Sequence, residues 1–313
     1  MAATPRDRAT VSLLYIRETV KERFIVIIEG MAEHNPPPVI VAFVSDLYFG
    51  VRIDQAASQQ GYRVEWIERL EQVAPEDLRA RSQQLAEHLE GPGAALLEKL
   101  TRWQPALLIF DLNNAQIPWR QWIPMLKSVP ATRRTPLLCF GSHVDGESLR
   151  TAQEAGADAV LARSQFYNSL PELIRKWVIQ PDLAAIASAC QQPLSELAKE
   201  GLELFNNGEY FEAHESLEKA WNEEQSPGRE LYQAILQVSV AYLQIERKNY
   251  RGALKMFLRM RQWLNPLPDR CRGVDVSRLR SDSEQVYAAL ISLGAEQIAN
   301  FDTRLFQPVW YDQ

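Results

Sequence analysis

The sequence predicts a doubly wound α/β domain, built on a five-stranded parallel sheet, followed by an all-α helical bundle. Two observations carry this prediction. Between residues 37 and 178, short apolar runs alternate with helical segments, which is typical of a parallel sheet covered on both faces. After residue 194, helical segments follow one another with short turns, which favours antiparallel neighbours in a compact bundle.

The length of 313 residues also favours two domains. We expect an N-terminal helix within residues 1–36, because apolar and charged positions recur there at helical spacing until the prolines at 36–38 end it. The α/β domain then covers 37–178. Two proline-containing stretches mark a linker over 179–193, and the helical bundle covers 194–313.

Five strands are predicted within the α/β domain: the buried run Val39–Val44, the alternating run Tyr62–Ile67, and Ala106–Phe110, Pro136–Phe140 and Ala159–Ala162. The helical segments around them are expected at 51–60, 75–90, 94–103, 119–129, 147–155 and from 163 through 178. In the second half we expect helices at about 194–207, 209–225, 229–248, 250–264 and 276–299, with a short helix at 183–190 and no strands.

The composition excludes several protein classes. A net charge of −6 does not suit a general nucleic-acid binder. The three cysteines, Cys139, Cys190 and Cys271, lie far apart without CxxC pairing, so we expect neither a disulfide nor a cysteine zinc site, and a reducing cytoplasm is the expected compartment. We expect no signal peptide. The apolar run Phe24–Ile28 is too short for a membrane span, so we expect no membrane association.

Polar side chains follow four of the predicted strands. They are Ser45–Asp46, Asp111, Gly141–Ser142 and Arg163–Ser164. Ligands of parallel α/β sheets bind at the carboxyl ends of the strands, so these residues are a first candidate site.

The α/β segment resembles a response-regulator receiver domain, the CheY-like or flavodoxin-like fold. The resemblance rests on Phe43–Ile53, Leu107–Asn114, Pro136–Ser142 and Ala155–Ser164. It implies that Asp111 corresponds to the aspartate that accepts a phosphoryl group, with Mg²⁺ held at Asp46 and Asp111.

This chain departs from the receiver pattern at three of these positions. Ser45 replaces one of the two acids that hold Mg²⁺, which removes one formal charge from a site that needs hard oxygen ligands. The family's hydroxyl residue falls at Gly141, with Ser142 next to it, and Arg163 replaces the family's lysine. Asp46, Asp111, Ser142 and Arg163 therefore form either a degenerate pseudo-receiver site or a working phosphoacceptor site.

A second candidate site lies in the stretch Phe205–Trp221. On a helix, Tyr210, His214, Glu218 and Trp221 share one stripe, with Glu215 beside it. We expect this stripe to point inward. Its candidate partners on neighbouring helices are Arg229, Gln237 and Asn249.

The same region, about Leu194–Leu264, resembles the helical domain-of-unknown-function family 309, whose pattern is His-Glu-x-x-x-Glu-x-x-Trp with one residue of variation. The matching positions are His214, Glu215, Glu218 and Trp221, then Gln237, then Asn249, Gly252 and Ala253. The resemblance implies no established activity.

Four interpretations of the stripe remain open. His214 bonded to a carboxylate and packed on Trp221 would fix the packing of the helices, and the same residues could instead line a polar ligand pocket. His214 and Glu218 could ligate a metal, or Glu218 could orient His214 as a general base. We assign no metal or other cofactor here.

Together these observations predict a non-enzymatic regulatory or interaction protein, with a degenerate receiver-like domain coupled to a helical effector domain. The alternatives are a response regulator phosphorylated at Asp111 and a metal- or small-ligand-binding enzyme centred on His214 and Glu218. We expect a protein partner. The receiver resemblance adds a homodimer. Six arginines near the proline loop are expected to form a solvated face, the alternative being a site for phosphate or an acidic partner: Arg259, Arg261, Arg270, Arg272, Arg278 and Arg280.

Overall fold

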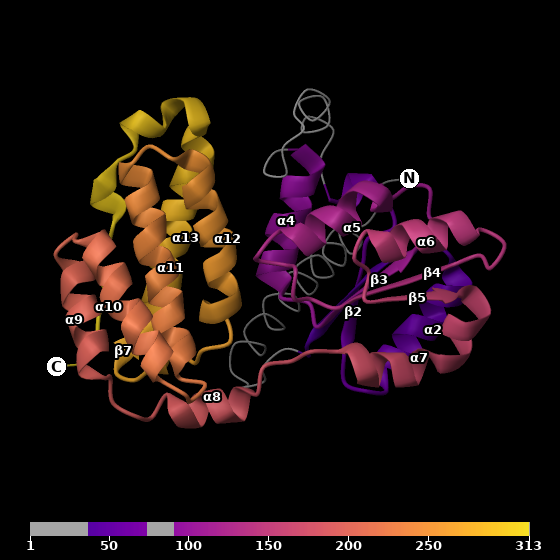
Figure 1. The fold of residues 1–313 in the computed structure, drawn as a ribbon, viewed down its shortest axis with the longest axis horizontal. Helices are drawn as coiled ribbons and strands as arrows, with labels where there is room; N and C mark the ends of the chain where they lie inside the picture. The colour runs from indigo at the N-terminus through magenta and orange to yellow at the C-terminus, as the bar shows by residue number, and fades with distance from the viewer. Residues whose placement is uncertain (1–36, 74–90, 313) are drawn as a thin grey trace, which may run out of the picture. The chain divides into compact units, whose positions relative to one another are not determined.

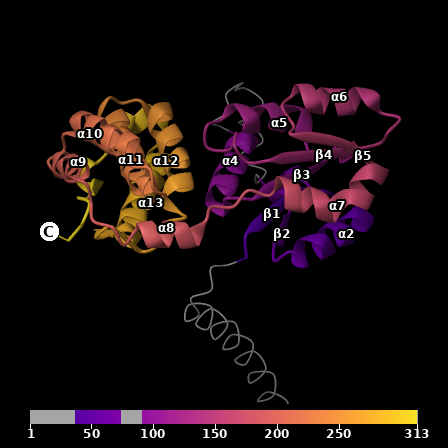
Figure 2. The same cartoon turned by 60° about the horizontal axis from the view of Figure 1, so that its bottom comes forward.

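The computed structural model describes residues 37–73 and 91–312 of the chain. The helix expected within 1–36 and the one expected over 75–90 lie outside the described residues. The remaining chain forms a parallel sheet with its helices, followed by a set of packed helices (Figures 1 and 2).

Five parallel strands form the sheet in the order β2-β1-β3-β4-β5, which confirms the predicted fold class. The strands are β1 (Val39–Phe43), β2 (Arg63–Trp66), β3 (Leu107–Asp111), β4 (Leu137–Gly141) and β5 (Ala159–Ala162). All residues of the three central strands are buried, whereas β2 and β5 lie at the edges and are partly exposed. Burial on both faces explains why the central runs are continuously apolar.

Helices cover both faces of this sheet (Figure 1). One face packs on α2 (Leu47–Ser58) and α7 (Arg163–Trp177). The opposite face packs on α4 (Gly91–Trp103), α5 (Trp119–Ser128) and α6 (Gly146–Glu154). Alternate strand residues enter the two cores, because successive side chains of a strand point to opposite faces.

The strand register places the candidate residues at one edge of the sheet. Phe43 pairs with Phe110, Asp111 pairs with Phe140, and Gly141 pairs with Ala162. The carboxyl ends of β1, β3, β4 and β5 are therefore level with one another.

The second half contains the predicted helices, with ends that differ by a few residues. They are α8 (Leu183–Ala189), α9 (Glu196–Asn206), α10 (Tyr210–Glu223), α11 (Arg229–Glu246), α12 (Tyr250–Leu264) and α13 (Val276–Leu293). Helix α11 is the centre of this core, since nearly every residue from Leu231 to Tyr242 is buried. Ser195, Asn249 and Asp275 cap α9, α12 and α13 by accepting a backbone N–H, which explains where these helices begin.

Two expectations about the second half are wrong. A short hairpin, β6 (Arg270–Cys271) and β7 (Val274–Asp275), lies in a region where no strand was predicted. Cys190 and Cys271 form a disulfide although 81 positions separate them, with 4.4 Å between their Cα atoms. Spacing along the chain could not reveal this pair, because the tertiary fold brings the hairpin to the end of α8.

The expectation of a solvated arginine face is also wrong for two of the six arginines. Arg261 is only 2% exposed and forms a bidentate pair with Glu284, at 2.7 and 2.9 Å. Arg272 is 7% exposed and pairs with Glu224 at 2.7 Å. A buried guanidinium needs a carboxylate partner, and both acids come from other helices or their ends.

No helix among the described residues is long and apolar enough to cross a membrane.

Candidate functional site

The first candidate site lies at the carboxyl edge of the sheet and comprises Asp46, Asp111, Ser142 and Arg163, the strand-end site. Asp111 is the last residue of β3, and Arg163 is the first residue of α7, directly after β5. Asp46 caps α2, because its Oδ1 accepts the backbone N–H of Tyr48 at 2.9 Å. Elements far apart in sequence thus bring these side chains together, as the level strand ends require.

The Arg163 guanidinium lies against both carboxylates. Its Nη2 donates to Asp111 Oδ2 at 2.9 Å, and its Nη1 lies 3.8 Å from Asp46 Oδ2. The guanidinium also packs over the ring of Phe49, 5.1 Å from the ring centroid. Phe49 comes from α2 and holds the planar group on one side, a contact that a lysine could not make in the same way.

Asp111 is the buried member of the site, with 2% of its surface exposed. Burial, the largest influence, raises the pKa of its carboxyl above the usual range, against the lowering effects of the Asn113 N–H and of Arg163. Its Oδ1 accepts the Asn113 N–H at 3.0 Å, so both carboxylate oxygens have a hydrogen-bond donor.

Ser142 is connected to Asp111 indirectly. Its backbone N–H donates to Asn113 Oδ1 at 3.0 Å, while the Asn113 backbone N–H donates to Asp111. Sequence reasoning missed Asn113, whose position two residues after the strand-end acid was the available signal. Gly141 presents no side chain at the family's hydroxyl position, and a Cβ there would meet Leu112 and Leu149 at 3.3 Å.

The donor set does not fit the Mg²⁺ that the fold family implies. Ser45 is exposed, the Asp46 carboxylate caps a helix, and the guanidinium of Arg163 already contacts both acids. Mg²⁺ is usually held by one or two carboxylates with water in its other positions, and here the guanidinium takes the place beside both carboxylates where such an ion would bind. Within the described residues, no group of three or more His, Cys, Asp or Glu side chains is arranged to hold a metal ion.

The second candidate site, the stripe on α10, is only partly turned inward. Tyr210 is buried, and burial raises its pKa to about 12. His214 and Trp221 are half-buried, whereas Glu215 and Glu218 are exposed. The buried face of α10 instead carries Ala213, Leu217 and Ala220. These residues come one position before His214, Glu218 and Trp221, respectively, so this face is turned by about 100° from the predicted one.

The expected bond between His214 and a carboxylate is not formed. Among residues 37–73 and 91–312, the His214 imidazole has no hydrogen-bond or ion-pair partner, and its neighbour on α10 is the ring of Phe211, with the two centroids 6.5 Å apart. Glu218 is exposed because it lies on the side of α10 that faces away from the core.

The three expected partners of the stripe have different environments. Arg229 stacks over Trp221, with its Cζ 4.2 Å from the ring centroid. Gln237 is 3% exposed, and its Oε1 has no hydrogen-bond partner among the described residues. Asn249 caps α12 and donates to Gln244 Oε1 at 2.7 Å. Only Arg229 therefore reaches the stripe by a contact seen in the structure.

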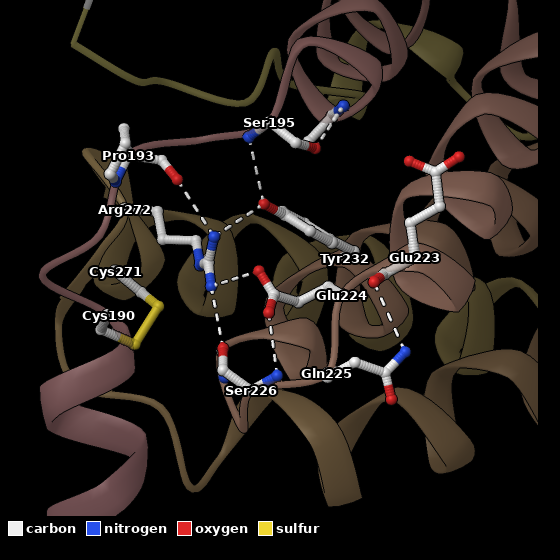
Figure 3. Close-up of polar contacts among 12 residues, drawn as sticks. Cys190, Pro193, Ser195, Glu223, Glu224, Gln225, Ser226, Tyr232, Cys271 and Arg272 are labelled. Carbon is white, nitrogen blue, oxygen red and sulfur yellow. Dashed lines mark hydrogen bonds and ion pairs between the residues drawn. A yellow bond between two sulfur atoms is a disulfide. The ribbon is translucent and has the colours of Figure 1, made fainter.

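A third polar cluster, which sequence reasoning missed, surrounds Arg272 (Figure 3). Its Nη1 donates to Pro193 O and Tyr232 Oη, both at 3.0 Å. Its Nη2 donates to Glu224 Oε2 at 2.7 Å and to Ser226 Oγ at 3.1 Å. We call these five residues the Arg272 cluster.

The Arg272 cluster joins four separate segments of the helical half. These are the stretch before α9, the end of α10, the first turn of α11 and the β6–β7 hairpin. Arg272 has a left-handed backbone, with φ of 52°, and the next residue, Gly273, has φ of 83°. This pair of left-handed residues closes the two-residue turn of the hairpin and aims the arginine inward.

Glu224 is the charge partner of Arg272. Burial would raise the pKa of its carboxyl, but hydrogen bonds from the Ser226 N–H and hydroxyl, together with Arg272, outweigh burial and lower it. The carboxylate therefore stays ionised beside the guanidinium.

Comparisons with known proteins found one family model and several solved structures. Residues 198–256 match the model of a domain of unknown function, DUF309. No curated protein matches the sequence. Among solved structures, a phosphorylated cyanobacterial phytochrome response regulator is 15% identical to this chain. The match covers 45% of this chain and 94% of the response regulator, with a TM-score of 0.34.

Two further receiver structures give similar values. The receiver domain of a Pseudomonas aeruginosa sensor histidine kinase is 13% identical, covers 45% of this chain and 97% of its own, and has a TM-score of 0.34. A Thermotoga maritima response regulator is 14% identical, and the match covers 45% of this chain and 96% of that protein, with a TM-score of 0.31. The fold itself rests on the strand order 2-1-3-4-5, which is that of flavodoxin-like sheets. The chain thus has a receiver-like α/β domain in its first half and a helical second half in which residues 198–256 match DUF309.

Proposed function

We propose that this chain is a non-enzymatic regulatory protein, in which a receiver-like domain without metal-dependent phosphoryl transfer controls a helical effector domain. The observation that carries the proposal is the position of Arg163. Its guanidinium lies 2.9 Å from Asp111 and 3.8 Å from Asp46, so an internal cation contacts both acids and offsets one of their two charges.

This arrangement opposes phosphoryl transfer for two physical reasons. Both Asp111 oxygens accept hydrogen bonds, one of them from a cationic guanidinium, which lowers the nucleophilicity of the carboxylate towards phosphorus. Transfer also depends on metal ions that neutralise charge on the phosphoryl oxygens, and the donors for such an ion are incomplete here. The strand-end site is then held in a single state by its own arginine.

The phosphorylation test compares two variants with the wild-type chain. Each is incubated with a small phosphodonor and Mg²⁺ and its intact mass is measured. The wild type should stay unmodified. The double variant Ser45→Asp, Arg163→Lys restores the family's charges and should gain one phosphoryl group, and adding Asp111→Asn to it should abolish the gain. A wild-type chain that becomes phosphorylated at Asp111 would refute the proposal and establish the response-regulator alternative.

A protein partner is the second part of the proposal. Large apolar side chains stand in solvent beside the strand-end site: Leu47 is 82% exposed, Val144 80%, Tyr48 63% and Val51 59%. Leu47, Tyr48 and Val51 lie on α2, and Val144 follows β4, so all four lie at the carboxyl edge of the sheet. An apolar surface of this kind is typical of an interaction site.

Affinity capture with the full-length chain tests this surface. The variant Leu47→Ser, Val144→Ser should lose a partner that the wild type retains, and light scattering distinguishes a second copy of the chain from another protein. Ile291→Ser is the matched control, because Ile291 is an exposed apolar residue of α13 at 44% exposure. Equal capture by both variants would contradict an interaction at this edge.

The enzyme or metal alternative centred on His214 is tested separately. Elemental analysis of untagged protein and of His214→Ala should give the same metal content. Stoichiometric metal in the wild type that disappears in His214→Ala would favour this alternative over ours.

A further inference from the structure

The disulfide between Cys190 and Cys271 lies where the two halves of the chain are joined in sequence. Cys190 is the C-terminal cap of α8, within the segment between α7 and α9. Cys271 lies in the β6–β7 hairpin of the helical half. The bond therefore ties the connecting helix to the bundle that follows it.

A pocket of about 500 Å³ reaches one of the two cysteines: Cys190 lines it and is 4% exposed, whereas Cys271 is fully buried. Cys190 and residues 191–194 line one part of it, and the hairpin lines another. The charged lining consists of three cations and one carboxylate: Lys199, Arg270, Arg272 and Asp312. Each of these cations pairs with an acid, Lys199 with Glu196, Arg270 with Asp312 and Arg272 with Glu224, so the lining carries little net charge and does not exclude an incoming thiolate.

Helix α8 depends on the disulfide more than the bundle does. It has seven residues, of which Ile186 and Ala189 are buried, and helices this short are marginal without outside contacts. Without the disulfide, the C-terminal cap of α8 is still held by the Arg272 N–H, which donates to Cys190 O at 2.7 Å, and the chain after it by the Arg272 guanidinium, which donates to Pro193 O at 3.0 Å. Cutting the disulfide should therefore loosen the body of α8, while its last residue and the bundle stay in place.

From these observations we infer that Cys190 and Cys271 are a redox-active pair, opened by dithiol reductants, whose reduction loosens α8 against the helical half. This inference goes beyond the proposed function, since it does not depend on Asp111. The redox state would set how firmly the receiver-like half is joined to its effector.

The chemical step balances as an ordinary thiol–disulfide exchange. A thiolate of the reductant attacks Cys190 Sγ, the residue that lines the pocket, and Cys271 Sγ leaves with the electron pair and takes a proton. The second thiol of the reductant then attacks its partner sulfur in the mixed disulfide and releases Cys190. Two electrons and two protons pass to the protein, and the reductant becomes a disulfide.

The test uses the folded, full-length chain. It is treated with dithiothreitol without denaturant, alkylated, and mapped by peptide mass; a parallel sample is followed by hydrogen–deuterium exchange. Cys190 and Cys271 should become alkylated together, and exchange in α8 should rise by about tenfold or more while that of α11 is unchanged. Reoxidation with oxidised glutathione should reverse both effects.

Variants separate the pair from other cysteine effects. Cys271→Ser should show the fast α8 exchange without reductant, whereas Cys139→Ala, which changes the free cysteine in the sheet core, should keep the slow α8 exchange. The inference is overturned if the bond opens only after unfolding, if α8 exchange stays the same after reduction, or if both thiols are free in protein kept in oxidised glutathione.

Discussion

Replacing Arg272 with methionine should strongly destabilise the helical half. The substitution keeps an unbranched side chain of similar length but removes four hydrogen bonds, to Pro193, Tyr232, Glu224 and Ser226. It also leaves the Glu224 carboxylate without its charge partner.

The magnitude follows from burial. Breaking a buried ion pair by removing one partner costs about 3–5 kcal/mol. The Glu224 side chain keeps 23% of its surface exposed, so water can replace part of what it loses, and we take the lower end, about 3 kcal/mol. That loss corresponds to about a 150-fold increase in the population of the open state, since each factor of ten is about 1.4 kcal/mol.

Hydrogen–deuterium exchange of the α11 amides measures this population, provided that exchange is slower than reclosing. Arg270→Met is the matched control, because Arg270 lies in the same hairpin and has its own carboxylate partner, Asp312, but both side chains are exposed. Exposed pairs of this kind contribute little, so the control should exchange almost as the wild type does. Mass spectrometry of the unreduced protein must show that the disulfide is intact in both variants. If Arg272→Met exchanges no faster than Arg270→Met, the reasoning about the buried cluster is refuted.

Three further predictions concern other parts of the chain. The pKa of Glu224 is lower in the folded chain than its usual value of 4.5. The ionised side chain therefore adds to the free energy of unfolding above pH 4.5, and this contribution is lost as pH falls through the folded pKa. In denaturant titrations at several pH values, Glu224→Gln should lose less stability on the acid side than the wild type does. Asp111 has the opposite pH dependence, because burial raises its pKa above the usual value of 3.8. Its contribution to the free energy of unfolding is complete below pH 3.8 and is lost as pH rises through the folded pKa. Asp111→Asn should remove this pH dependence of stability in the same titrations, and an unchanged dependence would contradict the reasoning. Gly201→Ala should lower the melting temperature, because the new Cβ would lie 2.7 Å from Leu217 Cγ. After the gain in helix propensity is subtracted, this overpacking should cost about 1–2 kcal/mol. The control Gly146→Ala should leave the melting temperature nearly unchanged, because its new Cβ would lie in open space.

Much of the α/β half could be predicted from local sequence. Continuous apolar runs identified the three central strands, because a central parallel strand is buried on both faces and needs no polar residue, and alternation identified the edge strand β2. The meeting of Asp46, Asp111 and Arg163 followed from the same logic, since level strand ends share one edge of the sheet. Prolines and glycines marked most helix ends in the second half for an equally local reason.

The facing of α10 was predicted wrongly, although its sequence carries a signal. Tyr210, His214, Glu218 and Trp221 share one side of the helix, whereas Ala213, Leu217 and Ala220, each one residue earlier in the sequence, share a side turned by about 100°. The second stripe is apolar, and apolar periodicity marks the face that packs against α9 and α11; the prediction followed the pattern of polar residues instead.

The sequence by itself determined the fold class, the division into two halves and the acid–arginine group at the strand ends, because each depends on residues close in sequence or on the parallel order of the strands. The tertiary structure alone decided the Cys190–Cys271 bond and the Arg272 cluster. Their members come from segments up to 81 positions apart, and chain spacing carries no information about which distant segments a folded core brings into contact.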